Sequence, residues 1–197
     1  MPTKFKIITL VIVIMVLVSG LIYYFNQRSK SEIFYLTPLT TDQSQRSSGD
    51  NHMILTSPAF ASNQFIPVNY TCDGKNVNPA LMISDVPVQA RSLALIVDDP
   101  DAPGGNFTHW LVWNIDPTVD SIIEDGLPSG AVQGLNDAKQ NTYFGPCPPN
   151  GIHHYHFKLY ALDQRLELDT RANKVKLESA INEHIIKQTE LVGLYSR

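Results

Sequence analysis

The stretch SLALIVDDPDAPGGNFTHWLVWNI, residues 92–115, decides the class of the fold. It opens with an apolar run rich in residues that strands favour, passes through turn-forming Asp, Pro and Gly, and closes with a second apolar run. These runs predict two buried strands, at Ser92–Val97 and His109–Ile115. A third run, HYHFKLYAL at His154–Leu162, predicts another strand of the same kind.

The rest of the chain from Met53 onward repeats this pattern of short apolar runs between Pro, Gly, Asn and Asp clusters. Its frequent prolines disfavour long helices over most of its length. One helix is predicted at Lys174–Leu191, with Asn173 as its N-cap and Gly193 as its C-terminal stop. Its apolar stripe follows the i, i+3, i+4 spacing: Leu177, Ala180, Ile181, His184, Ile185 and Leu191. The sequence therefore predicts a mainly β fold with a C-terminal helix.

The N-terminus carries the other long apolar segment, Ile7–Phe25, which holds 19 residues and no charge. As a helix it would be about 28 Å long, close to the hydrocarbon thickness of a bilayer. Lys4 and Lys6 precede it, as in a signal sequence, but no clear A-x-A cleavage site follows. We expect an uncleaved anchor in residues 1–28, with an extracytoplasmic body; cleavage would give a secreted protein instead.

Residues 29–52 lie between the anchor and the body and are rich in Ser, Thr, Gln and Asp. The stretch TTDQSQRSSGDN, residues 40–51, has no apolar side chain at all. Such composition is typical of a flexible linker. The predicted organisation is therefore an anchor at 1–28, a polar stalk at 29–52 and one folded domain at 53–197.

Charge narrows the class of partner. From His52 onward the chain has ten Lys and Arg against sixteen Asp and Glu, a net charge of −6 with histidine neutral. This negative charge argues against a nucleic-acid-binding protein with a basic face, and it disfavours a polybasic domain that binds membrane surfaces. Any recognition of an anion must therefore come from placed hydrogen-bond donors.

The residues that could bind a ligand or catalyse a reaction are concentrated in the turns and at the strand ends. Two aspartates, Asp99 and Asp101, follow the first buried strand, and His109 opens the next. The segment GPCPPNGIHHYH, residues 145–156, leads into the third strand. Because alternate residues of a strand share a face, His153 and Tyr155 are predicted to point one way, and His154 and His156 the other. An H-x-H pair can hold zinc, but no third ligand at a telling spacing accompanies it, so neither a metal nor a cofactor is predicted.

The two cysteines, Cys72 and Cys147, can form one bridge or remain thiols. A free Cys147 beside a histidine could act as a nucleophile, and a bridge would be expected in an oxidising compartment. Neither a G-x-S-x-G elbow nor a glycine-rich phosphate loop before a helix is present in the sequence.

Five segments, in order, resemble the phosphatidylethanolamine-binding protein family, above all its bacterial and archaeal Raf-kinase-inhibitor-like branch. The shared signature is D-P-D-A-P at Asp99–Pro103, a histidine-led strand at His109–Asn114 and a Gly/Pro-rich loop ending in G-x-H-x-Y at Gly145–Tyr155. The branch adds I-P-x-x-Y-T-C-D-G at Ile66–Gly74 and E-L-x-G-x-Y at Glu190–Tyr195.

The resemblance implies an antiparallel β-sandwich with a small pocket at one end, closed partly by the C-terminal helix. Such pockets accept phosphate-type anions, including phospholipid headgroups. Carried over to this chain, the pocket residues are Asp99, Asp101, His109, Gly145, Pro148, His153 and Tyr155. The resemblance also implies a bridge between Cys72 and Cys147, since both lie in motifs of this branch.

The function expected from these observations is a membrane-tethered binding protein for a small phosphate-type anion or headgroup, without catalytic residues. Two alternatives remain open. One is an inhibitor or regulator of a protease or another protein partner, as some relatives are. The other is a hydrolase that uses His109 or Cys147.

Overall fold

The computed structural model describes residues 17, 19–24 and 52–197. Most of the predicted anchor at 1–28 and nearly all of the stalk at 29–52 therefore lie outside the described residues. Residues 17 and 19–24 are helical. Among the residues described, no helix has the length and apolar character needed to cross a membrane. The chain divides into two units, residues 1–47 and 48–197, and the strands described below all belong to the second.

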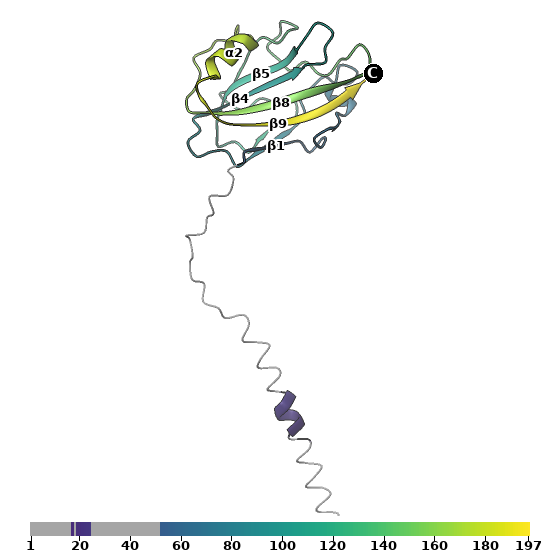
Figure 1. Cartoon of the computed structure of the whole chain (residues 1–197), viewed down its shortest axis with the longest axis vertical. Helices are drawn as coiled ribbons and strands as arrows, with labels where there is room; N and C mark the ends of the chain where they lie inside the picture. The colour runs from purple at the N-terminus through teal and green to yellow at the C-terminus, as the bar shows by residue number, and fades with distance from the viewer. Residues whose placement is uncertain (1–16, 18, 25–51) are drawn as a thin grey trace, which may run out of the picture. The chain divides into compact units, whose positions relative to one another are not determined.

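Two sheets build the domain (Figure 1). The larger has the order β2-β9-β8-β4-β5-β7 and the smaller has the order β1-β3-β6. All pairings are antiparallel except that of β2 with β9, which is parallel. The strands are β1 (Ile54–Thr56), β2 (Gln64–Phe65), β3 (Leu81–Ser84), β4 (Ser92–Asp99), β5 (Phe107–Ile115), β6 (Ser121–Ile122), β7 (Val132–Gln133), β8 (Ile152–Leu162) and β9 (Ile185–Ser196). A short 3₁₀ helix, η2, covers Val68–Tyr70.

Strand β4 is the centre of the larger sheet, and all eight of its residues are buried. Its side chains alternate between two cores, as the period of a strand requires. Leu93, Leu95 and Val97 pack in the first core, whereas Ala94 and Ile96 pack in the second. Burial on both faces explains why SLALIV reads as an unbroken apolar run. The predicted strands are confirmed, with β4, β5 and β8 each two residues longer.

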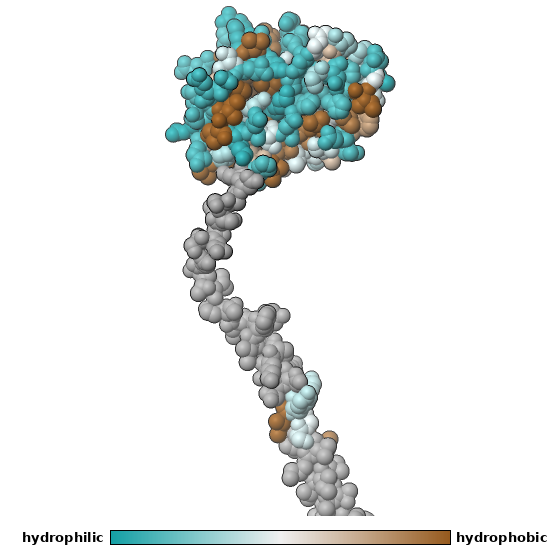
Figure 2. Space-filling model, in the orientation of Figure 1, coloured by the Kyte–Doolittle hydropathy of each residue, from teal (hydrophilic) through white to brown (hydrophobic). Residues whose placement is uncertain are grey.

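The first core lies between the two sheets and the second lies under the helix α2 (Lys174–Ile181). The smaller sheet contributes Leu55, Leu81, Ile83 and Ile122 to the first core. The helix contributes Leu177 and Ile181 to the second. The domain is therefore a β-sandwich with one short helix on the outer face of its larger sheet. The face seen in Figure 2 is mostly hydrophilic, with scattered apolar patches.

The predicted helix at Lys174–Leu191 is wrong in its second half. Asn173 caps the helix as predicted and accepts a hydrogen bond from the Lys176 backbone N–H, but the helix ends at Ile181. Residues Ile185–Ser196 form β9, which pairs with β8 along its whole length. The i, i+4 spacing of apolar residues persists by coincidence beyond the true end, and the sheet pairing outweighs it.

Candidate functional site

A cavity of about 410 Å³ opens where β4 ends and β5 and β8 begin. Its walls are mainly apolar, with three polar side chains among them. The lining residues are Asp99, Ala102, Pro103, Phe107, His109, Ala138, Phe144, Cys147, Pro148, Pro149 and His153. A mainly apolar cavity with a few convergent polar groups is typical of small-molecule sites.

Asp99 and His153 meet at this cavity from neighbouring strands. Asp99 is the last residue of β4, and His153 is the second residue of β8. The Asp99 Oδ2 atom lies 2.7 Å from the His153 Nδ1 atom, and both side chains are buried. Since a carboxylate accepts, Nδ1 carries the proton and donates. Within residues 52–197 the ring of His153 makes its hydrogen bond through Nδ1 only, so the other ring nitrogen, Nε2, is available to a ligand in the cavity.

His109 reaches the same cavity because of a β-bulge. Trp110 pairs with Val97, and Thr108 pairs with Asp98, so His109 is the extra residue of β5. Without a bulge, His109 and Leu111 would share a face of the sheet. Leu111 packs in the second core, whereas His109 lines the cavity. Bulges commonly re-aim a side chain beside a functional site.

The ring of His109 is held in one tautomer. Its Nδ1 atom lies 2.6 Å from the carbonyl oxygen of Phe144, and a carbonyl can only accept, so Nδ1 donates. Burial lowers the pKa of His109, although the Phe144 carbonyl and the charge of Asp99 act in the opposite direction. At neutral pH the ring is therefore uncharged, and its Nε2 atom is a hydrogen-bond acceptor.

A disulfide fastens the wall formed by Cys147 and Pro148. Cys147 is bridged to Cys72, as expected, and the Cys72 N–H donates to the Pro146 carbonyl at 3.0 Å. Pro148 is one of the predicted pocket residues and lines the cavity. Because the Cys147 sulfur is bridged, the thiol nucleophile considered from the sequence is not present in this structure.

Four of the seven predicted pocket residues line the cavity: Asp99, His109, Pro148 and His153. Asp101 does not, because it lies on the outer side, where its Oδ2 atom accepts from the backbone N–H and the Nδ1 atom of His154. Gly145 faces away from the cavity as well. A Cβ there would lie 2.5 Å from the Tyr70 carbonyl oxygen, and its N–H donates to Asn76. The glycine therefore serves loop packing.

Tyr155 lies behind the two histidines. Its ring is fully buried, 5.1 Å from the His109 ring centroid and 6.5 Å from that of His153. Its hydroxyl has no hydrogen-bond partner among the described residues. Burial and then the charge of Asp99 raise the pKa of Tyr155, so the phenol stays protonated. The tyrosine supports the histidine rings instead of lining the cavity.

Sequence reasoning missed most of the apolar lining. Phe107 lies on the same face as Asp99, its pairing partner in β4, and its ring contacts His109. The two-residue period of the strand could have pointed to it, since it stands two residues before His109. Phe144 comes from a loop without regular structure, and no pattern in the sequence marks it.

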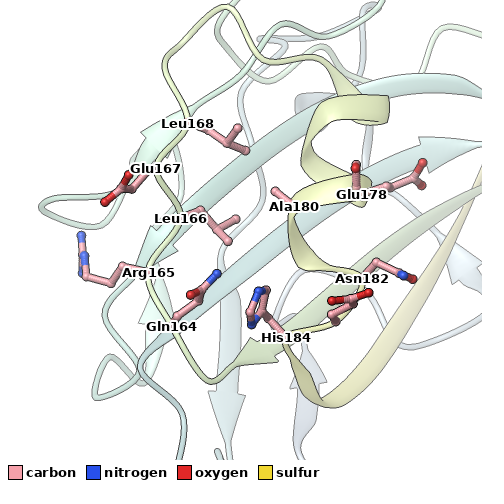
Figure 3. A pocket seen from close by; sticks show the side chains of 11 residues that line it. Gln164, Arg165, Leu166, Glu167, Leu168, Glu178, Ala180, Asn182 and His184 are labelled. Atoms are coloured by element: carbon pink, nitrogen blue, oxygen red, sulfur yellow. The ribbon is translucent and has the colours of Figure 1, made fainter.

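A larger cavity, of about 790 Å³, lies elsewhere, between α2 and residues 164–168 (Figure 3). It contains none of the predicted pocket residues, and most of its lining is exposed. One of its polar groups, His184, is already paired with Asp163 at 2.9 Å. No residue of α2 lines the Asp99–His153 cavity, so the expected closure by the C-terminal helix is not found in the described residues.

Comparison with known proteins agrees with this arrangement. The family model for phosphatidylethanolamine-binding protein matches residues 56–196. A UPF0098 protein of Pyrococcus abyssi is 47% identical over 159 residues, which are 76% of this chain and 88% of the relative. A UPF0098 protein of Methanothermobacter thermautotrophicus is 46% identical over 150 residues, 74% of this chain and 99% of the relative.

Two crystal structures share the fold. A phosphatidylethanolamine-binding protein homolog of Chlamydia trachomatis superposes with a TM-score of 0.72 at 43% identity, over 75% of this chain and 99% of the other. YbcL of E. coli, described as a new member of the mammalian family, superposes with a TM-score of 0.71 at 33% identity, over 74% and 99%. On the sequence match, the sandwich and these relatives together, the chain belongs to the phosphatidylethanolamine-binding protein family.

Proposed function

We propose that this protein is a membrane-tethered binding protein that takes a small phosphate-type group, such as a phospholipid headgroup, into the cavity at Asp99, His109 and His153. One observation carries the proposal. Two histidines line a single cavity with their Nδ1 atoms occupied, at 2.6 Å by the Phe144 carbonyl and at 2.7 Å by Asp99. Their Nε2 atoms are the groups left for a ligand.

The protonation of the site favours a ligand that brings hydrogen-bond donors of its own. At neutral pH the His109 Nε2 atom accepts, and Asp99 adds a negative charge. No Lys or Arg lines the cavity to balance a free dianion. A zwitterionic headgroup, with an ammonium or hydroxyl beside its phosphate, suits this site better than inorganic phosphate. Modest affinity is expected, because an imidazolium donor must form before the phosphate gains a charged hydrogen bond.

The test is calorimetric titration of phosphorylethanolamine into the full-length protein. His109→Ala and His153→Ala should each weaken binding about ten- to a hundred-fold, the cost of roughly 1.5–3 kcal/mol for a hydrogen bond to a charged group. His184→Ala is the matched control, since that histidine is paired with Asp163 away from the cavity. Equal binding by all four proteins would contradict the proposal, and parallel titrations of phosphate and of ethanolamine show which half of the headgroup is recognised.

Tethering rests on the uncharged apolar segment Ile7–Phe25 and the polar linker that follows it. The full chain should remain in membranes after carbonate extraction, and a chain lacking residues 1–28 should be soluble. A mature protein whose N-terminal sequence started near Leu21 would show cleavage and overturn the anchor.

A further inference from the structure

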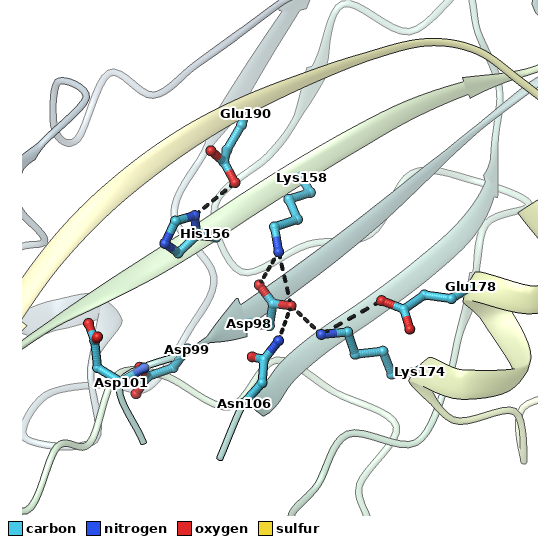
Figure 4. Close-up of polar contacts among 9 residues, drawn as sticks. All are labelled: Asp98, Asp99, Asp101, Asn106, His156, Lys158, Lys174, Glu178 and Glu190. Atoms are coloured by element: carbon cyan, nitrogen blue, oxygen red, sulfur yellow. Dashed lines mark hydrogen bonds and ion pairs between the residues drawn. The ribbon is translucent and has the colours of Figure 1, made fainter. Parts of the chain in front are cut away.

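The carboxylate of Asp98 is fully buried, and Figure 4 shows it among its polar partners. Because neighbouring residues of a strand point to opposite faces, Asp98 lies on the face of β4 opposite Asp99 and the cavity. Three side chains from three parts of the chain hold the carboxylate. Asn106, just before β5, donates to Oδ2 at 2.9 Å, and the Lys158 ammonium of β8 donates to the same atom at 3.2 Å. The Lys158 ammonium also lies 2.9 Å from Oδ1, which accepts no hydrogen bond from the described residues. The Lys174 ammonium, from the first turn of α2, forms an ion pair with Oδ2.

This cluster keeps Asp98 charged although its side chain is fully buried. Burial acts to raise the pKa of Asp98, but the contacts with Lys174, Lys158 and Asn106 outweigh it and hold the pKa below its ordinary value. Lys174 also lies 3.7 Å from Glu178 one turn along the helix. A buried carboxylate with three partners is expected to be held in place, since releasing a partner removes part of what compensates a charge in the interior.

Asp98 directly precedes Asp99, a residue of the cavity, in the sequence. Asp98 is the last residue of β4 that pairs with β8, opposite His156. The next residue, Asp99, points to the other face and holds His153 at 2.7 Å. Beyond Asp98, the end of β4 is held by its pairing with β5, by the contacts that fix Asp98, and by Asp101. The Asp101 N–H donates to Asp99 Oδ1 at 2.8 Å, and its Oδ2 atom accepts from His154 of β8. Loss of the contact between Asp98 and Lys174 of α2 would therefore also displace the next residue, Asp99, at the cavity.

We propose that Asp98 is a positioning residue, which clamps the end of β4 to Asn106, Lys158 and Lys174 so that Asp99 stays in register with His153. Its effect on a ligand rests on the proposed function, whereas its effect on the Asp99–His153 hydrogen bond does not. The clamp links the N-terminal turn of α2 to a cavity that the helix itself does not touch.

The decisive variant is Asp98→Asn, because two explanations predict opposite signs. Removal of a negative charge near the cavity should, by electrostatics alone, strengthen the binding of a phosphate group. Loss of positioning should weaken phosphorylethanolamine binding about tenfold, the size of effect found when groups that orient a metal ligand are removed. Glu178→Gln makes the same charge change in the same network without touching Asp98, and should leave affinity unchanged.

A second readout needs no ligand. Proton NMR of the ligand-free full-length protein should show a low-field, exchange-protected Nδ1–H signal of His153 donating to Asp99. In Asp98→Asn this signal should move upfield or exchange at least several-fold faster, and in Glu178→Gln it should not. If Asp98→Asn fails to fold, Lys174→Met is judged on this signal alone, with Lys176→Met as its control on the same helix. An unchanged signal in the folded variant, or tighter phosphorylethanolamine binding, overturns the proposal. Absence of binding by the wild type would count against the proposed function only.

Discussion

Gly193 of β9 lies directly opposite Tyr155 of β8 in the antiparallel pairing of the two strands. The space beside this glycine is filled from another part of the first core. A Cβ at position 193 would lie 2.5 Å from an Ile66 carbon and 2.8 Å from a ring carbon of Phe60. Gly193 is therefore needed for close packing next to Tyr155, and not as the end of a helix.

Gly193→Ala should lower the free energy of unfolding by about 1–3 kcal/mol, the usual cost of forcing a methyl group into a filled core. Urea unfolding measures it. Gly104→Ala is the control, because nothing lies within 4 Å of a Cβ there, and its effect should stay within about 0.5 kcal/mol. Similar stabilities for the two variants would contradict the packing argument.

The stability of the domain should depend on pH through His109. Burial lowers the pKa of this ring in the folded state, so between the folded value and the unfolded value of about 6.5 the unfolded chain binds the extra proton. The stabilisation is fully present above pH 6.5 and is lost as the pH falls toward the folded pKa. His109→Gln cannot bind that proton, so its unfolding free energy should fall less steeply between pH 6.5 and 5. Parallel slopes for variant and wild type would show that His109 does not contribute.

The affinity for an anion should increase as the pH falls, whereas the stability of the domain should decrease. Protonation of His109 turns its Nε2 atom from an acceptor into a charged donor, so the binding of an anion should strengthen as the pH falls toward the lowered pKa of this ring. Sulfate is the probe, since its own charge does not change in this range. One coupled proton allows at most about a tenfold gain per pH unit. The gain should be smaller in His109→Ala, and a flat profile in the wild type would refute the coupling.

The bridge between Cys72 and Cys147 closes a loop with a sequence separation of 75. The chain-entropy account gives about 4 kcal/mol of stabilisation for a loop of this length. Replacing both cysteines by Ser should lower stability by up to this amount in denaturant unfolding. It should also weaken phosphorylethanolamine binding, because Cys147 belongs to the cavity wall. Unchanged binding would show that neighbouring hydrogen bonds hold that wall without the bridge.

Strands buried on both faces or alternating cleanly could be predicted from the sequence, because burial dictates their residue pattern. Ser92–Val97 and His154–Leu162 are examples, and both are strands in the structure. The end of α2 could not be predicted, because Ile185 and Leu191 satisfy a helical spacing as well as a strand. Only the long-range pairing with β8 decides between them.

The features of the candidate site also fall into two groups, those that a local sequence pattern predicts and those that depend on the packing of distant segments. Alternation along β8 correctly placed His153 and Tyr155 on one face, opposite to His154. That Tyr155 lies behind the rings depends on how separate segments pack. The close approach of the Gly145 backbone to the Tyr70 carbonyl also depends on this packing, and no local sequence pattern encodes it. The position of His109 depends on a bulge, which appears only in the register of β4 and β5. The anchor at residues 1–28 lies largely outside the described residues and stays a prediction.

The position of β9 within the larger sheet has a consequence for biosynthesis. Of the described strands, β9 is the last to be synthesised, yet it lies between β2 and β8 in the sheet. Until residues 185–196 emerge from the ribosome, β8 has an open edge and β2 has no partner at all. Open strand edges invite pairing with other chains. A nascent chain therefore exposes these edges to aggregation until residues 185–196 have been made, and the larger sheet can close only after translation has reached β9.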